Sequence, residues 1–237
     1  MLTLYTFGPT RTLPDPSPFV TKALVLLKMA GLPYQAKTGG LRGAPKGKLP
    51  FLDDDGQKIA DSSFIRMHLE SRHRIDFDRG LSSAQKAEAW AFEKLCEDHL
   101  YWIIVRERWT KDDNFDAGPR VFFAAAPALI RPLIISIMRR KVRRELWSQG
   151  LGRHSEAETV ALVKRGYGAI SDFLAEKPFL MGPEPCGADA TVFAWVSSAL
   201  WENTKGEVSD AIASYANLRA YRDRGMQRWF PEMPHGA

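Results

Sequence analysis

The spacing of apolar residues changes near residue 75, and this change limits the folds open to the chain. Before it, short alternating segments indicate strands at 2–7 and 32–36 and a hairpin at 49–60, with helical stripes between and after them. After it, only long helical patterns follow. We therefore expect an α/β domain over residues 1–75, followed by an all-α domain over residues 82–237.

Capping residues mark where several helices begin. Ser17 followed by Pro18 is typical of a helix start, because proline at the first position needs no amide partner. Asp61 precedes the second helix, and Ser82 with Gln85 forms a capping box before the third. Ser155 and Glu158 form another box, and long helical patterns cover 82–110, 119–148, 155–176, 187–202 and 208–228.

The composition is that of a globular protein in a reducing compartment. Apolar residues make up 45% and charged residues 26%. Two cysteines cannot form a disulfide framework. The first six residues lack the features of a secretory signal. The most apolar stretch, 121–138, is broken by prolines and an arginine, whereas a membrane span needs about 20 apolar residues. We expect a cytoplasmic protein without a membrane span.

The basic run Arg139–Arg144 holds much of the net charge of +5. Such a run can bind nucleic acid or an anionic membrane, or it can be the solvated, cation-rich C-terminal end of a helix. No aromatic or glycine-rich pattern accompanies it. We expect the helix end, and no nucleic-acid partner.

Several motifs resemble the glutathione transferase superfamily. Leu49-Pro50 before the hairpin and Asp61-Ser62 after it, in a thioredoxin-like domain followed by helices, carry this resemblance. It implies the glutathione transferase fold, with an α/β thioredoxin-like N-terminal domain and an all-α C-terminal domain. Similarity to the bacterial type of the failed-axon-connections/metaxin-like branch lies in segments 17–19, 28–34, 59–65, 99–102, 150–154 and 177–182.

The resemblance implies that Pro50 follows a cis peptide bond and that Leu49 offers its main-chain groups to the cysteinyl part of glutathione. An exposed main chain can pair with an extended peptide as an added strand does. The alternative is an ordinary trans proline that opens a strand.

The resemblance also assigns the two ends of glutathione. Asp61 and Ser62 are implied at the γ-glutamyl end, where the free amides of a helix N-terminus suit a carboxylate. The alternative is plain helix capping by the same residues. Lys48 is a candidate for the glycyl carboxylate; Lys37, Lys46 and Arg11 are alternatives.

Ser17 is the first candidate for activating the glutathione thiol, since a hydroxyl at a helix N-terminus stabilises a thiolate. The competing interpretation is a simple helix cap. Other registers put the activating group at Thr10, Thr12 or Tyr5. Val20 occupies the position where relatives often carry cysteine, so disulfide exchange through a protein dithiol is disfavoured.

A pocket for a second substrate is expected between the domains, lined by Tyr101, Trp102, Arg106 and Trp109 at helical spacing. An aromatic stripe of this kind can equally be core. Cys96 lies on an apolar stripe and is expected to be a core residue. The five histidines show no metal-ligand spacing, and we expect no metal.

Cys186 and Asp189 resemble the superfamily's capping box in the helical domain, with a thiol in place of the usual hydroxyl. We expect Asp189 to accept from the amide of Cys186, and Cys186→Ser to stabilise the protein.

Together these features predict a glutathione transferase that conjugates or reduces a small electrophile in detoxification, as a homodimer with glutathione as co-substrate. The alternative is a non-catalytic binding or assembly module that keeps the fold. A third reading is a binder of anionic surfaces through Arg139–Arg144.

Overall fold

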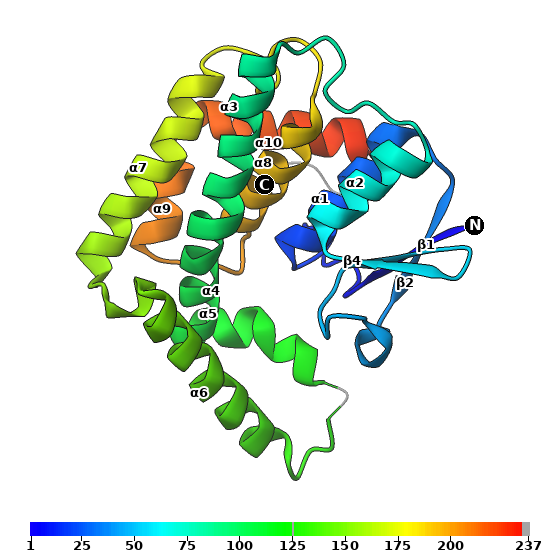
Figure 1. Ribbon diagram of the computed structural model, residues 1–237. Coiled ribbons are helices and arrows are strands. Elements are labelled where there is room, and N and C mark those ends of the chain that lie inside the picture. Colours follow the sequence, from blue (N-terminus) through cyan, green and yellow to red (C-terminus); the bar gives the residue numbers. More distant parts are fainter. Residues whose placement is uncertain (125, 234–237) are drawn as a thin grey trace.

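The computed structural model describes residues 1–124 and 126–233. A small mixed sheet with two helices forms the N-terminal domain, and helices form the C-terminal domain (Figure 1). This confirms the fold class expected from the sequence. Every helix in these described ranges is too short or too polar to cross a bilayer.

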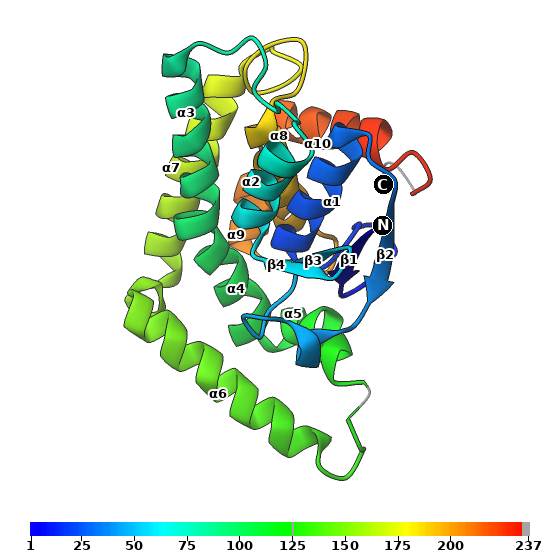
Figure 2. The same ribbon diagram turned by 45° about the vertical axis from the view of Figure 1, so that its right-hand side comes forward.

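The sheet has four strands in the order β2-β1-β3-β4. Strand β1 runs parallel to β2 and antiparallel to β3, and β3 pairs antiparallel with β4. Helices α1 and α2 lie side by side on one face of the sheet, between it and the C-terminal domain (Figure 2). The bounds are β1 Leu2–Thr6, α1 Pro18–Ala30, β2 Tyr34–Thr38, β3 Phe51–Asp54, β4 Gln57–Ala60 and α2 Ser62–Arg72, with a 3-10 turn at Leu41–Gly43.

The C-terminal domain begins with two helices joined by a π-helical turn and ends with α10. Both expected capping boxes, Ser82 with Gln85 and Ser155 with Glu158, are present. The bounds are α3 Ser83–Lys94, the π-helical turn Leu95–Leu100, α4 Tyr101–Thr110, α5 Asp112–Ala117, α6 Arg131–Gln149, α7 Glu156–Leu174, α8 Gly187–Ala199, α9 Glu207–Ala213 and α10 Ala216–Trp229, with 3-10 turns at Pro119–Phe123 and Leu151–Arg153.

Helix α8 is the centre of the core, because every one of its residues is buried. It packs against α1, and the ring of Phe19 meets Trp195 edge-on at 4.8 Å. One continuous apolar cluster therefore runs through both domains. Cys96 belongs to it and is fully buried, as the sequence predicted.

A buried ionic network also joins the domains. The ammonium of Lys22 on α1 lies 2.9 Å from Glu93 and 2.6 Å from Glu97, and its side chain is fully buried. Arg66 on α2 pairs with the same Glu93 and, at 2.5 Å, with Asp78. Burial acts to raise the pKa of Glu93, but the charges of Lys22 and Arg66 hold it below its ordinary value. The network thus keeps its carboxylate ionised in the interior.

Asp189 caps α8 as expected. Its carboxylate accepts the amide of Cys186 at 2.9 Å, the amide of Leu180 at 2.9 Å and the hydroxyl of Tyr221 at 2.8 Å. Burial raises its pKa.

The expected helix over 119–148 is wrong. Residues 119–123 form a 3-10 turn, and α6 starts only at Arg131 and runs to Gln149, leaning away from the rest of the molecule (Figures 1 and 2).

The basic run Arg139–Arg144 therefore lies in the middle of α6, so its interpretation as a helix end is wrong. Arg139 is held by the carbonyls of Trp109 and Thr110 and by Asp112; Arg140, Lys141, Arg143 and Arg144 are exposed. The pattern over 208–228 likewise divides into α9 and α10.

Candidate functional site

Strand register brings three chain segments to one edge of the sheet. Tyr5 near the end of β1 pairs with Phe51 at the start of β3, which pairs with Ala60 at the end of β4. The loop after β1, the residues before β3 and the start of α2 all leave the sheet at this edge. These segments contain Ser17, the Leu49-Pro50 pair and the Asp61-Ser62 pair.

The Leu49–Pro50 peptide bond is cis, as expected. The side chain of Leu49 is buried, and its N–H and C=O pair with no other backbone group in residues 1–124 and 126–233. The carbonyl of Pro50 accepts the amide of Asp61 at 3.4 Å. The segments predicted to hold the cysteinyl and γ-glutamyl parts of glutathione are thus in direct contact.

Asp61 begins α2 in an unusual conformation. Its φ is 84°, a region that non-glycine residues seldom occupy and that is common at functional sites. Its carboxylate accepts the amide of Ser63 at 2.8 Å, so it caps the helix. The buried hydroxyl of Ser62 has no partner within the described part of the chain. The helix start combines a partial positive charge with an unsatisfied hydroxyl.

Asp15 is a site residue that sequence reasoning missed. Its carboxylate is 1% exposed and accepts the amides of Phe7, Gly8 and Ser17 at 2.9, 3.0 and 2.9 Å. Burial raises its pKa to about 7, although the three amides favour the charged form. Asp15 therefore fixes the end of β1 to the residue that opens α1. Asp15 lies between Pro14 and Pro16, two residues before the expected helix cap, and this position is the sequence feature that could have pointed to it.

Ser17 is the N-cap residue of α1, with φ −92° and ψ 121°. Its half-buried hydroxyl makes no capping hydrogen bond, which leaves it open to another acceptor or donor. Among the alternatives, the hydroxyl of Thr10 accepts the amide of Leu13 at 2.9 Å. The hydroxyl of Thr12 is buried and has no partner among the described residues. The ring of Tyr5, the third alternative, stacks on Phe51 at 4.1 Å.

Arg108 is the second residue that sequence reasoning missed. It is almost fully buried, and its guanidinium donates to the carbonyl of Pro16 at 2.7 Å and to the carbonyl and hydroxyl of Ser198 at 2.6 and 2.9 Å. It also lies over the ring of Trp201, 4.5 Å from its centroid. No carboxylate in the described ranges pairs with it, and burial lowers its pKa to about 10. The buried cation of Arg108 thus contacts the loop that carries Ser17.

Lysines also populate this edge. Lys48 is exposed, Lys46 lies 4.3 Å from the ring of Phe64, and Lys37 lies 5.6 Å from the ring of Tyr5. Arg11 instead pairs with Glu202 of the C-terminal domain at 2.5 Å. The positive charge of the edge suits a ligand with carboxylates at both ends.

The four residues expected to line a second-substrate pocket are not all brought together. Tyr101 meets Phe19 of α1 edge-on at 4.9 Å and Trp102 at 5.4 Å. Arg106 pairs with Glu107 at 3.0 Å and Glu156 at 2.9 Å. Trp109 packs on Phe115 and Phe123 in a separate apolar cluster. Of the four, Tyr101 contacts the start of α1, and Trp102 is its neighbour along α4.

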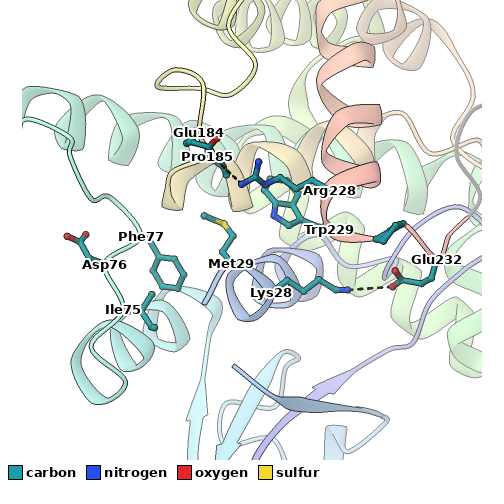
Figure 3. Close-up of a pocket in the computed structure, with 11 residues that line it drawn as sticks. Lys28, Met29, Ile75, Asp76, Phe77, Glu184, Pro185, Arg228, Trp229 and Glu232 are labelled. Carbon is teal, nitrogen blue, oxygen red and sulfur yellow. Dashed lines mark hydrogen bonds and ion pairs between the residues drawn. The ribbon is translucent and has the colours of Figure 1, made fainter. Parts of the chain in front are cut away.

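A cavity of about 550 Å³ lies elsewhere, at the C-terminal ends of α1 and α10 (Figure 3). Two ion pairs lie among its lining residues, Lys28 with Glu232 at 3.5 Å and Arg228 with Glu184 at 2.8 Å. Lys28 is about 16 Å along α1 from Ser17. This cavity is therefore distinct from the edge that holds the candidate site.

A small thioredoxin-like domain followed by a helical domain defines the glutathione transferase class. Residues 18–114 match the family described as the glutathione S-transferase N-terminal domain, and residues 163–225 match the glutathione S-transferase C-terminal domain. The chain is 31% identical over 233 residues to the isoprene-epoxide–glutathione S-transferase of Rhodococcus sp. (strain AD45), covering 94% of this chain and 97% of the relative. The chain belongs to the glutathione S-transferase superfamily.

Two further relatives confirm the similarity to the failed-axon-connections/metaxin-like branch. Failed axon connections of Drosophila melanogaster is 33% identical over 204 residues, which cover 82% of this chain but only 49% of the relative. Human metaxin-2 is 23% identical over 214 residues, covering 89% and 81%. Beta-etherase LigF from Sphingobium sp. strain SYK-6 shares the fold, with a TM-score of 0.64, 17% identity and coverage of 98% and 99%.

Proposed function

We propose that this protein is a cytoplasmic glutathione transferase that ionises the glutathione thiol and transfers it to a small electrophile, or uses it to reduce one. The observation that carries the proposal is the convergence of Ser17, Leu49-Pro50 and Asp61-Ser62 at one sheet edge. We place the boundary between its two domains at residues 75–82.

In this proposal the tripeptide lies along the edge as an extra strand. The main chain of Leu49 pairs with the cysteinyl part, and Pro50 shapes that segment. The start of α2 takes the γ-glutamyl carboxylate on the amide and hydroxyl of Ser62, while Asp61 meets the ammonium group. Lys48 pairs with the glycyl carboxylate. The hydroxyl of Ser62, which has no partner in residues 1–124 and 126–233, supports this arrangement.

The hydroxyl of Ser17 donates a hydrogen bond to the glutathione sulfur. The partial positive charge at the start of α1 and the buried cation of Arg108 both favour a thiolate there. Asp15 holds the loop so that these groups stay in place before the substrate binds. The catalytic contribution is therefore positioning and thiolate stabilisation.

For the electrophile, the name of the relative from Rhodococcus supports testing a small epoxide first. The thiolate would attack an epoxide carbon, the carbon–oxygen bond would break, and the alkoxide would take up a proton. Tyr101 and Trp102 are the proposed apolar contacts, with Arg106 and Trp109 further along the same helix.

The direct test is calorimetry with reduced glutathione, followed by conjugation assays with a small epoxide and an aryl halide. Saturable binding together with turnover supports the transferase. Binding without turnover for any electrophile favours the second candidate, a binding or assembly module. The similarity to Failed axon connections and metaxin-2, whose names state no reaction, is what favours that candidate. Absence of glutathione binding would refute the transferase.

We also propose a homodimer, which sedimentation equilibrium would test. A single species at the monomer mass over the whole concentration range would refute it.

A further inference from the structure

Three metal-ligating side chains meet at the end of the sheet opposite the candidate glutathione site. The Nε2 atoms of His68 and His73 both lie 2.8 Å from the same oxygen, Oδ2 of Asp54. The three ligand atoms all lie within 4.8 Å of one another. Two imidazoles and a carboxylate therefore converge on one point.

The cluster is built from two separate elements. Asp54 is the last residue of β3, His68 lies on α2, and His73 is the residue that ends α2. Their side chains are 12%, 10% and 24% exposed, so the site is mostly buried but remains reachable from water.

The local charge is also suitable for a cation. Asp53 and Asp55 flank Asp54 in the hairpin. Within the described ranges, the only ion pair of the Asp55 carboxylate is with the terminal amine of Met1. The carboxylate of Asp53 accepts the amide of Gly56 at 2.7 Å.

We propose that Asp54, His68 and His73 bind a divalent cation of the zinc type, with water as the fourth ligand. Zinc bonds to histidine nitrogen and carboxylate oxygen are about 2.0–2.2 Å long, which puts the donors of a tetrahedral site about 3.3 Å apart. The two distances of 2.8 Å between a histidine nitrogen and the Asp54 oxygen need an increase of about 0.5 Å each. Two imidazoles and one carboxylate are a ligand set that zinc accepts.

This inference departs from the sequence-based expectation of no metal, which depended on spacing alone. Residues five apart do not share a helix face. His73 has already left the helix, with φ −102° and ψ 2°, and this turns its ring back toward His68. Asp54 then completes the set from a neighbouring strand.

The ion would hold together the far ends of β3 and α2. At the near ends of the same two elements, Pro50 immediately precedes β3 and Ser62 is the first residue of α2. Binding is therefore expected to make the N-terminal domain harder to unfold, whether or not the protein conjugates glutathione.

The test uses the full-length protein without a histidine tag, stripped with a chelator and free of glutathione. Zinc chloride alone is titrated by calorimetry, and cobalt(II) is followed by its visible absorption. The thiols of Cys96 and Cys186 are buried and do not compete. We expect one ion per chain, a cobalt spectrum of nitrogen and oxygen ligands, and a rise in melting temperature on adding zinc.

His68→Ala, His73→Ala and Asp54→Asn should each weaken zinc binding by more than the roughly tenfold that loss of an outer partner costs. The matched control is His154→Ala, which removes an exposed histidine outside the cluster. No binding by the wild type, or equal binding by the variants, would overturn the proposal. If the variants fail to fold, the wild-type stoichiometry and cobalt spectrum decide.

Discussion

The guanidinium of Arg108 on α4 lies 2.7 Å from the main-chain carbonyl oxygen of Pro16. Pro16 immediately precedes Ser17, the first candidate for activating the thiol. The same side chain reaches Ser198 at the end of α8. A single buried cation therefore joins the loop that carries Ser17 to helices α4 and α8 of the other domain.

Arg108→Lys should destabilise the protein by about 2–4 kcal/mol. One ammonium group cannot replace a guanidinium that donates to both Pro16 and Ser198. Each hydrogen bond to a charged group contributes about 1.5–3 kcal/mol. Urea denaturation measures the free energy of unfolding. Arg120→Lys, at an exposed pair with Asp116, is the control and should change little. Equal effects of the two changes would show that the buried fork does not matter.

Ser17→Ala should lower kcat/KM for conjugation by roughly 100-fold, as does loss of one donor to a developing anion. It should also raise the pKa of bound glutathione toward the ordinary thiol value of about 8.5, measured by thiolate absorbance against pH. Thr12→Val and Tyr5→Phe are the matched controls. Loss of activity in either control, with Ser17→Ala unaffected, would move the activating group to that residue.

Asp15 should make stability fall as pH rises. Its pKa is raised from 3.8 to about 7 in the folded protein, so the folded state holds this proton where the unfolded chain has lost it. The free energy of unfolding should therefore decrease between about pH 4 and about pH 7, by at most about 4 kcal/mol.

Urea titrations of wild type and Asp15→Asn across that range measure the difference in slope. The carboxyl of Asp189, whose pKa is also raised by burial, contributes equally to both proteins. Parallel curves for the two proteins would contradict the assignment.

Lys22→Met should cost about 3–5 kcal/mol, since it leaves the buried carboxylates of Glu93 and Glu97 without their shared cation. Adding Glu93→Gln and Glu97→Gln should restore part of the loss, as measured by thermal and urea unfolding. Lys141→Met, at an exposed pair, serves as control. A triple variant less stable than the single one would contradict this account.

Cys186→Ser should raise stability by a few tenths to about 1 kcal/mol, because a hydroxyl caps α8 better than a thiol does. Differential scanning calorimetry provides the measurement, with Cys96→Ser as a control that should destabilise the protein by placing a hydroxyl at a fully buried position. A lower melting temperature for Cys186→Ser would refute the capping explanation.

The sequence predicted those features that depend on neighbouring residues. The alternation around β1, the Asp-Gly turn between β3 and β4, and the serine caps of α3 and α7 are all local signals, and all appear at the expected places. The helix over 119–148 failed for a local reason too, because prolines interrupt the pattern: residues 119–123 form a 3-10 turn and α6 begins at Arg131.

Features that depend on distant partners could not be predicted. Arg108 and Pro16 are 92 residues apart, and an arginine on a helix gives no sign that it will be buried. Asp15 in a proline-rich loop resembles an ordinary exposed turn residue until the end of β1 is seen to donate to it. His73 resembled an isolated histidine because the helix end that reorients it is not visible in the spacing.

Both cysteine side chains are buried. Cys96 is fully buried and Cys186 is 3% exposed, and burial raises the pKa of both thiols. Since the thiolate is the reactive form, neither side chain offers a nucleophile to passing alkylating agents or oxidants. The proposed transferase would thereby be protected from alkylation by its own electrophile, and a covalent adduct would form on the sulfur of glutathione instead of on the protein.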